Sequence, residues 1–260
     1  MRFATRVSFT LLAILLIGFA MPRPAPAASY NITWLSMAPT AVGNTVPSGS
    51  VYVVPGIGTV TLTYTAPSPP QSINLIRQSS PSVSNLNVTS GGDLYSWTTY
   101  EQIAGTMSAT PLGPFPYSIT YTFSQSIPAG ALYLTTGGLG RTSQAVDGQG
   151  GFAAGTTTAT VPTSGVFLGE VDGGNNWGAN VFTGGAGSFQ LYNSQTGAGG
   201  SDPWWNTKAS VIQITDPVTS LTVNMNHLRG DGAGVNIGFD TSFPTSARQN
   251  TWGRMKHLYR

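Results

Sequence analysis

Residues 58–66 read GTVTLTYTA, a stretch in which apolar and hydroxyl-bearing side chains strictly alternate. Val60, Leu62 and Tyr64 occupy every second position, and threonines fill the positions between them. Successive side chains of a β-strand point to opposite faces of its sheet, so this stretch predicts a strand with one apolar and one polar face. Such a strand buries its apolar face in a core and leaves the other face in water.

The same alternation recurs along the chain, in PYSITYTFS (116–124), TSLTVNMN (219–226) and GVNIGFD (234–240). Weaker strands are predicted at Tyr30–Leu35, Val51–Val54, Ile73–Ile76, Leu94–Thr99, Ala131–Thr135, Thr156–Val161, Gly165–Val171, Asn180–Thr183, Ser188–Tyr192 and Ser210–Thr215. Only Tyr100–Ser108 and the C-terminal tail have a faintly helical pattern. Many short strands with almost no helix predict an all-β fold, an antiparallel β-sandwich or jelly roll. A solenoid is the alternative, but the sequence has no fixed period to support it.

The amino terminus has the pattern of an export signal. Arg2 and Arg6 precede an uncharged apolar run, Val7–Met21, and Ala25-Pro26-Ala27 fits a cleavage site before Ala28. A membrane anchor is the alternative, but the run is shorter than the roughly 20 apolar residues that span a bilayer. We therefore expect residues 1–27 to be a signal peptide and the mature chain to be secreted, either extracellular or periplasmic.

The predicted organisation is one sandwich domain, 28–247, followed by a basic tail, 248–260. A boundary at the proline-rich APSPPQ segment, 66–71, followed by the serine-rich residues 78–90, would divide the chain into two modules. The residues before that segment are too few for a stable core of their own, so we expect them to supply strands to the main sandwich.

Composition excludes several classes of function. The 260 residues include no cysteine and 2 histidines, which excludes disulfides and thiolate metal sites. Three of the 11 basic residues belong to the signal, and four others follow Asp240, the last acidic residue. The body of the chain therefore keeps four basic residues against nine acidic ones. It lacks the clustered basic face that nucleic-acid binding needs. No later segment is long and apolar enough to span a membrane as a helix.

The densest acidic segment is EVDGGNN, residues 170–176, and it predicts a calcium site. Glu170, Asp172 and Asn176 would supply the oxygen ligands that calcium prefers, on a flexible glycine-rich turn. The spacing of these three residues resembles the metal-binding segment of legume-type lectins, and GDGAGVNIGF (230–239) resembles a second segment of that family. The two segments stand in the opposite order here, so the resemblance implies a possible cation site and no activity. An exposed turn with scattered acids is the alternative.

Three tryptophans stand among polar residues rather than in apolar runs. Trp177 lies in GNNWGAN, and Trp204 and Trp205 lie in SDPWWNT. Indole rings exposed in loops could stack on the apolar faces of sugars, with nearby amides and carboxylates binding the hydroxyl groups. The polar residues predicted for that role are Asn175, Asn180 and Asp202. The alternative is that these tryptophans fold back and close the ends of the sandwich.

The leading interpretation is an exported, non-catalytic β-sandwich that binds a glycan or another cell-envelope polymer, or belongs to an extracellular matrix. Its composition is similar to that of exosortase-sorted bacterial surface proteins, although the sorting tail of those proteins is absent. One alternative is a polysaccharide lyase or glycoside hydrolase that uses Glu170, Asp172 or His227. Another is a self-assembling structural protein, which long uncovered sheet edges would favour.

Overall fold

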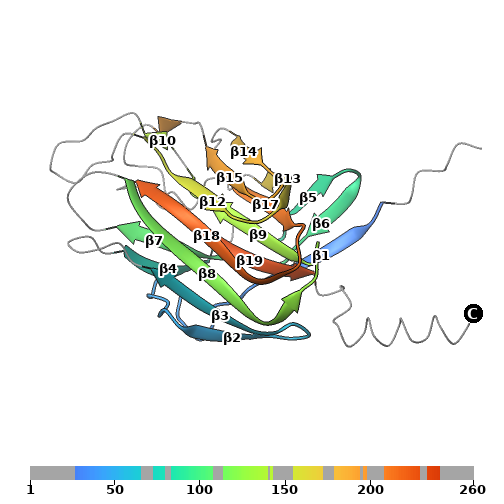
Figure 1. Ribbon diagram of the computed structural model, residues 1–260, viewed down its shortest axis with the longest axis horizontal. Coiled ribbons are helices and arrows are strands. Elements are labelled where there is room, and N and C mark those ends of the chain that lie inside the picture. The colour runs from blue at the N-terminus through green and yellow to red at the C-terminus, as the bar shows by residue number, and fades with distance from the viewer. Residues whose placement is uncertain are drawn as a thin grey trace, which may run out of the picture.

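The computed structural model describes residues 27–65, 73–79, 83–107, 114–139, 141–142, 155–171, 179–193, 196–197, 208–228 and 233–240. The regular elements of these residues are all β-strands, arranged as two large sheets that pack face to face and one small sheet (Figure 1). Nearly all neighbouring strands are antiparallel, so the predicted all-β antiparallel sandwich is confirmed. No helix in the described part of the chain is long and apolar enough to cross a membrane.

The first large sheet has seven strands, all joined in antiparallel pairs. In spatial order they are β14 (Asn180–Gly184), β15 (Phe189–Asn193), β12 (Thr158–Val161), β18 (Val218–Leu228), β8 (Pro114–Ile127), β3 (Gly58–Thr65) and β2 (Ser50–Val54). Strand β3 holds the threonine-alternating stretch, and its Leu62 lies opposite Tyr121 of β8.

The second large sheet has nine strands and is branched. Its main path is β13 (Gly165–Val171), β17 (Ala209–Ile214), β9 (Leu132–Gly137), β19 (Ala233–Asp240), β1 (Ser29–Trp34), β6 (Asp93–Ser96) and β5 (Asn87–Ser90). Its branch is β7 (Glu101–Met107), which pairs with β19 and with β4 (Ile73–Ser79). Within this sheet β1 and β6 run parallel. The small sheet joins β10 (Arg141–Thr142) to β11 (Gly155–Thr156) and β16 (Thr196–Gly197).

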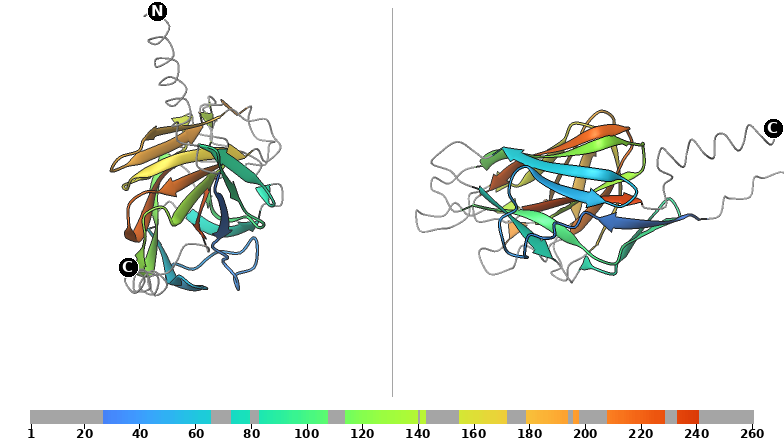
Figure 2. Two further views of the ribbon diagram at one scale, coloured as in Figure 1. Left: turned by 90° about the vertical axis from the view of Figure 1, so that its right-hand side faces the viewer. Right: turned by 90° about the horizontal axis from the view of Figure 1, so that it is seen from below.

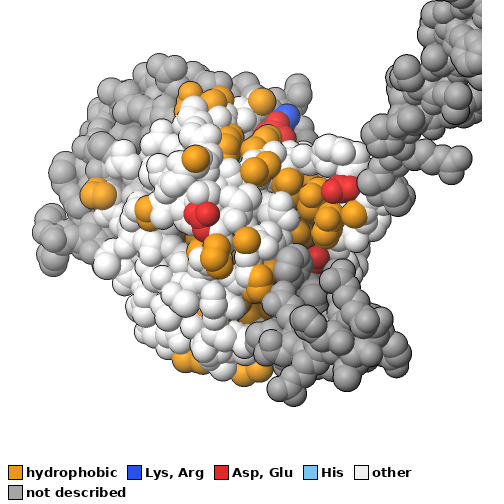
Figure 3. All heavy atoms as spheres, turned by 45° about the vertical axis from the view of Figure 1, so that its right-hand side comes forward, with side chains coloured by type: hydrophobic (Ala, Val, Ile, Leu, Met, Phe, Trp, Pro, Cys, Tyr) orange, Lys and Arg blue, Asp and Glu red, His pale blue; other side chains and the backbone are white. Residues whose placement is uncertain are grey.

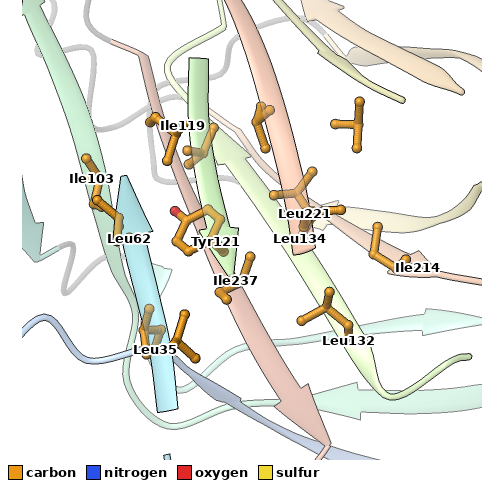
Figure 4. Packing of buried hydrophobic residues seen from close by; sticks show 14 of the residues in the cluster. Leu35, Leu62, Ile103, Ile119, Tyr121, Leu132, Leu134, Ile214, Leu221 and Ile237 are labelled. Atoms are coloured by element: carbon orange, nitrogen blue, oxygen red, sulfur yellow. The ribbon is translucent and has the colours of Figure 1, made fainter. Parts of the chain in front are cut away.

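The main hydrophobic core lies between the two large sheets. Figure 4 shows Leu62, Ile119 and Tyr121 of the seven-stranded sheet facing Leu134 and Ile237 of the other sheet. These side chains are almost fully buried, whereas the hydroxyl-bearing residues between them on β3 and β8 point away from the core and are partly or fully exposed. The alternation in the sequence therefore determines which face of each strand is buried.

A second hydrophobic core lies on the opposite face of the nine-stranded sheet. Trp34, Trp97, Tyr133 and Val88 belong to it, and their rings and methyl groups pack against β13 and β17. The sheet curls until β13 and β5, the two ends of its main path, meet. Their closeness shows at Gly169 of β13, where an added Cβ would lie 3.2 Å from Cβ of Val88 on β5. Figure 2 shows the β5–β6 hairpin beside β1 at one end of the molecule. Every described residue of β9 and β19 is buried, because one core lies on each side of these strands.

Asn236 occupies the point at which the nine-stranded sheet branches. One edge of β19 pairs with β7 over Ala233–Val235 and with β1 over Gly238–Asp240. The fully buried side chain of Asn236 lies between these two pairings. Its Nδ2 donates to the backbone oxygens of Leu35, at 3.0 Å, and Glu101, at 2.7 Å. The amide therefore satisfies two carbonyl groups that the diverging strands leave without a ladder partner.

One expectation from the sequence is wrong. Tyr100–Ser108 has a faintly helical pattern, but Glu101–Met107 is strand β7. Tertiary packing overrides the local preference here, since Gln102 is buried over the glycines Gly137 and Gly234, whose added Cβ atoms would each lie under 3.0 Å from its side chain. Strand β5, at the end of the serine-rich residues 78–90, is absent from the strands that the sequence predicts.

Candidate functional site

Two of the nine predicted site residues lie in the described part of the chain. Glu170 is on β13 and Asn180 is the first residue of β14. The other seven lie outside the described residues: Asp172, Asn175, Asn176, Trp177, Asp202, Trp204 and Trp205. The predictions that these residues bind a cation or a ligand stay predictions.

Glu170 and Asn180 belong to one hydrogen-bonded group, which we call the polar cluster: Glu170, Asn180, Asn193, Lys208 and Ser210. The cluster joins four segments, because Asn193 ends β15, Ser210 lies on β17 and Lys208 immediately precedes β17. The antiparallel pairs that bring these segments together are β14–β15 and β13–β17. The ends of β13 and β15 and the starts of β14 and β17 are thereby held in contact.

The carboxylate of Glu170 has two partners in the polar cluster. Its Oε1 lies 3.0 Å from Nζ of Lys208, and its Oε2 accepts a hydrogen bond of 2.8 Å from the backbone N–H of Asn180. The side chains of Glu170 and Lys208 are only 17% and 22% exposed, so this ion pair is less screened by water than a surface pair. A cation at Glu170 would share oxygens that already face a positive charge, which weakens its binding there.

The side chain of Asn180 is turned inward. Its Nδ2 donates to the backbone oxygen of Lys208 at 3.1 Å and to Oγ of Ser210 at 2.7 Å. Its Oδ1 accepts a hydrogen bond of 2.9 Å from Nδ2 of Asn193. Because both amide hydrogens and the carbonyl oxygen have protein partners, Asn180 acts in this structure as an anchor between strands.

The polar cluster lies beside the ends of the two segments that carry the three predicted tryptophans. Residues 172–178 follow β13 directly after Glu170 and Val171, and β14 begins with Asn180. Residues 198–207 end at Lys208. Both segments thus start or end at residues that are hydrogen-bonded to one another, and Figure 1 shows β13, β14 and β17 close together.

The remaining described carboxylates have structural contacts. Glu101 forms an ion pair with Arg77 and accepts a hydrogen bond of 3.0 Å from the backbone N–H of Met37. Asp216 accepts a hydrogen bond of 2.9 Å from the backbone N–H of Ser164, and hydrogen bonds from Ser164 lower the pKa of this carboxyl group. No group of three or more metal-binding side chains of the kind His, Cys, Asp or Glu occurs within the described ranges.

Sequence reasoning missed the roles of Asn193, Lys208 and Ser210. Lys208 lies 38 residues from its partner Glu170 along the chain, and no local pattern marks the pair. The prediction that Ser210 lies on a strand is confirmed, but its partner on β14 follows only from the sheet order. Long-range pairing therefore places the cluster, and only Glu170 and Asn180 among its members were singled out from the sequence.

The surface has few charges to attract an oppositely charged partner. Figure 3 shows one face on which acidic and basic side chains are scattered among hydrophobic and uncharged polar ones. No charged residue occurs between Arg23 and Arg77, a range that includes β1, β2 and β3. Comparison of the chain with models of protein families, with curated proteins and with solved structures finds no match.

Proposed function

We propose that this protein is exported and binds a neutral glycan or another uncharged cell-envelope polymer through the segments at 172–178 and 198–207. The observation that carries the proposal is the polar cluster. Its hydrogen bonds hold both ends of the segment at 172–178 and the C-terminal end of the segment at 198–207 at one place on the sandwich. Binding residues on loops held by a rigid scaffold are a common arrangement in proteins.

Chain connectivity supports a single site. Trp177 stands three residues before Asn180, and Trp205 stands three residues before Lys208. At about 3.8 Å between consecutive Cα atoms, the chain limits Trp177 and Trp205 to about 11 Å from their anchors and Trp204 to about 15 Å from Lys208. The two anchors are hydrogen-bonded to each other, so the three indole rings can reach one extended ligand.

The scarcity of charge supports an uncharged ligand. Ligand sites that recognise sugars combine flat apolar surfaces with a few hydrogen-bonding groups. The predicted binding segments carry the amides Asn175 and Asn176 and the carboxylate Asp202 beside the tryptophans. Calcium held by Glu170, Asp172 and Asn176 stays part of the proposal.

A glycan array tests the proposal. The mature chain from Ala28 is screened against soluble glycans and insoluble polysaccharides, with and without a calcium chelator. We expect binding by the unmodified chain and loss of binding by Trp205→Ala. The matched control is Asn224→Ala, an exposed position on the outer face of β18, which keeps full binding.

Two results would overturn this function. Equal binding by Trp205→Ala and the unmodified chain would remove the tryptophan segments from the site. Release of shortened products from a bound polysaccharide would instead indicate a lyase or hydrolase. An unchanged array in the presence of chelator would remove calcium from the proposal and leave the glycan site in place.

The free edge of β2 favours self-assembly as a second candidate function. Strand β2 ends the seven-stranded sheet and pairs with β3 alone among the described strands. Its Val51 and Val53 are 59% and 78% exposed, and no charge or proline within SVYVV discourages pairing with another strand. A second copy fits this edge, because antiparallel pairing centred on Tyr52 sets Val51 against Val53 of the other copy.

Light scattering tests self-assembly through β2. We expect the mature chain to form dimers at high concentration and Val53→Lys to remain monomeric, since a charge on the edge opposes strand addition. The control is Val166→Lys on β13, which introduces the same charge at another exposed valine. A monomer at every concentration, or equal association by Val53→Lys, would contradict the proposal.

A further inference from the structure

The backbone nitrogen of Ala28 is held by a carboxylate. Its N–H donates to Oδ1 of Asp93 at 2.8 Å, and its carbonyl oxygen accepts a hydrogen bond of 2.9 Å from the N–H of Leu94. Directly after this contact, β1 pairs in parallel with β6, starting with Ser29 opposite Leu94. Ala28 is therefore fixed at both its nitrogen and its oxygen, at the point where β1 joins the β5–β6 hairpin (Figure 1).

The hairpin turn positions Asp93. Gly91 and Gly92 connect β5 to β6 with φ angles of +60° and +94°, the left-handed conformation that two-residue hairpin turns require. Asp93 follows as the first residue of β6 and lies opposite Ser90 of β5. The carboxylate of Asp93 thus lies directly after a two-residue turn.

Ala28 is also the residue that the predicted signal cleavage makes the first of the mature chain. Hydrolysis breaks the C–N bond between Ala27 and Ala28. The hydroxyl group of a water molecule goes to the Ala27 carbonyl carbon and its proton to the Ala28 nitrogen. The resulting amine takes up a second proton, which the new Ala27 carboxyl group releases, and becomes an α-ammonium group with three donors. Because the pKa of an α-amino group is about 8, most of these groups are positively charged at neutral pH.

We propose that Asp93 is the receptor for this new N-terminus, so that cleavage before Ala28 converts a neutral hydrogen bond into an ion pair that fastens β1 to β6. Charge-assisted hydrogen bonds are about twice as strong as neutral ones. β1 also supplies Ile32 and Trp34 to the second core, and the β5–β6 hairpin supplies Val88 and Tyr95. Signal removal at this bond therefore strengthens the junction that closes the second core.

This inference rests on the export that the proposed function assumes, but it does not depend on glycan binding. Intact-mass measurement of the secreted protein separates the two. A mature chain that starts at Ala28 supports the inference, and one that starts at any other residue overturns it. Either result leaves the glycan array free to support or contradict the proposed function.

Unfolding of four proteins tests the ion pair directly. The chain starting at Ala28 is compared with one that keeps Ala27, whose Ala28 N–H still donates but carries no charge. Each form is prepared with Asp93 and with Asp93→Asn. We expect the free terminus to raise the folding equilibrium constant roughly fivefold, about 1 kcal/mol, only when Asp93 is present.

Controls distinguish an ion pair from a general effect of the substitution. We expect the fivefold difference to shrink in 1 M salt and to vanish near pH 10, where the amine loses its proton. Asp216→Asn, which removes a carboxylate that contacts Ser164, should change both N-terminal forms equally. An equal effect of Asp93→Asn on the two forms would overturn the inference.

Discussion

Asn236 at the branch of the nine-stranded sheet offers a sharp test of the fold. Its side chain is fully buried and makes three hydrogen bonds: two to the carbonyls of Leu35 and Glu101, and one of 2.8 Å accepted from the N–H of Ile237. Asn236→Ala leaves three buried backbone groups without partners, at about 1–3 kcal/mol each. We expect a loss of roughly 3–9 kcal/mol, a large fraction of the roughly 5–15 kcal/mol that stabilises a typical domain.

Asn236→Asp keeps the volume and the acceptor but replaces the donor by an oxygen that faces two carbonyl oxygens. Burial there raises the pKa of the introduced carboxyl group, so the variant is most destabilised at neutral pH and recovers as the pH falls and the group gains a proton. Urea unfolding followed by tryptophan fluorescence at pH 7 and pH 4 measures both effects.

The matched control is Asn224→Asp, the same change at an exposed asparagine on β18. We expect this control to shift the free energy of unfolding by no more than about 0.5 kcal/mol at pH 7. Equal, small losses in Asn236→Asp and Asn224→Asp would refute the assignment of Asn236 as the residue that holds the branch together.

Four further substitutions test the packing and the electrostatics. Tyr121→Phe removes a buried hydroxyl that has no hydrogen-bond partner among the described residues, so it should stabilise the fold by about 1 kcal/mol in thermal melts. Tyr100→Phe breaks a hydrogen bond of 3.0 Å to Thr135, so it should destabilise the fold by a similar amount in the same assay. Gly238→Ala places a Cβ 2.5 Å from the ring of Trp34 and should cost about 1–3 kcal/mol in urea unfolding, so a neutral effect would contradict the second core. The pKa of Asp216 lies below its ordinary value of 3.8, so the stability that this carboxylate contributes is present above that value and is lost as the pH falls through the lower, folded-state pKa. Asp216→Asn should therefore flatten the fall in stability below about pH 4, and an unchanged acid profile would count against that contact.

Local alternation in the sequence was enough to predict three strands of the seven-stranded sheet, β3, β8 and β18, and which of their faces is buried. On β3, β8 and β18 one face meets the main core and the other meets water, so the apolar and hydroxyl-bearing residues alternate with a period of two. The apolar set of β19, Val235, Ile237 and Phe239, was also predicted correctly. The sequence of each of these strands alone therefore indicates which of its faces is buried.

The second core could not be predicted in this way. The small and polar residues of β19 read as a solvent-facing set, yet Gly238 and Asn236 are buried. What covers them comes from distant parts of the chain: Trp34 of β1 lies against Gly238, and β5, which contributes Val88, is not among the predicted strands. A covered small residue and an exposed one look the same in sequence, because the distinction depends on long-range packing.

For the candidate site, the sequence predicts residue types but not their anchoring. Glu170 is predicted to bind a cation and Asn180 a ligand, and the structure shows in addition that both contact Lys208. Their hydrogen bonds cross from β13 and β14 to the start of β17, so their partners depend on sheet order. The tryptophans remain the residues proposed to contact the ligand.

Calorimetric titration of the glycan found on the array tests the single shared site most directly. The mature chain is compared with Trp177→Ala and Trp205→Ala, each checked for an unchanged unfolding midpoint. The proposal predicts one ligand per chain and an affinity about 30-fold lower in each variant, equivalent to about 2 kcal/mol for a buried aromatic contact. Two ligands per chain, or unmodified affinity in either variant, would contradict it.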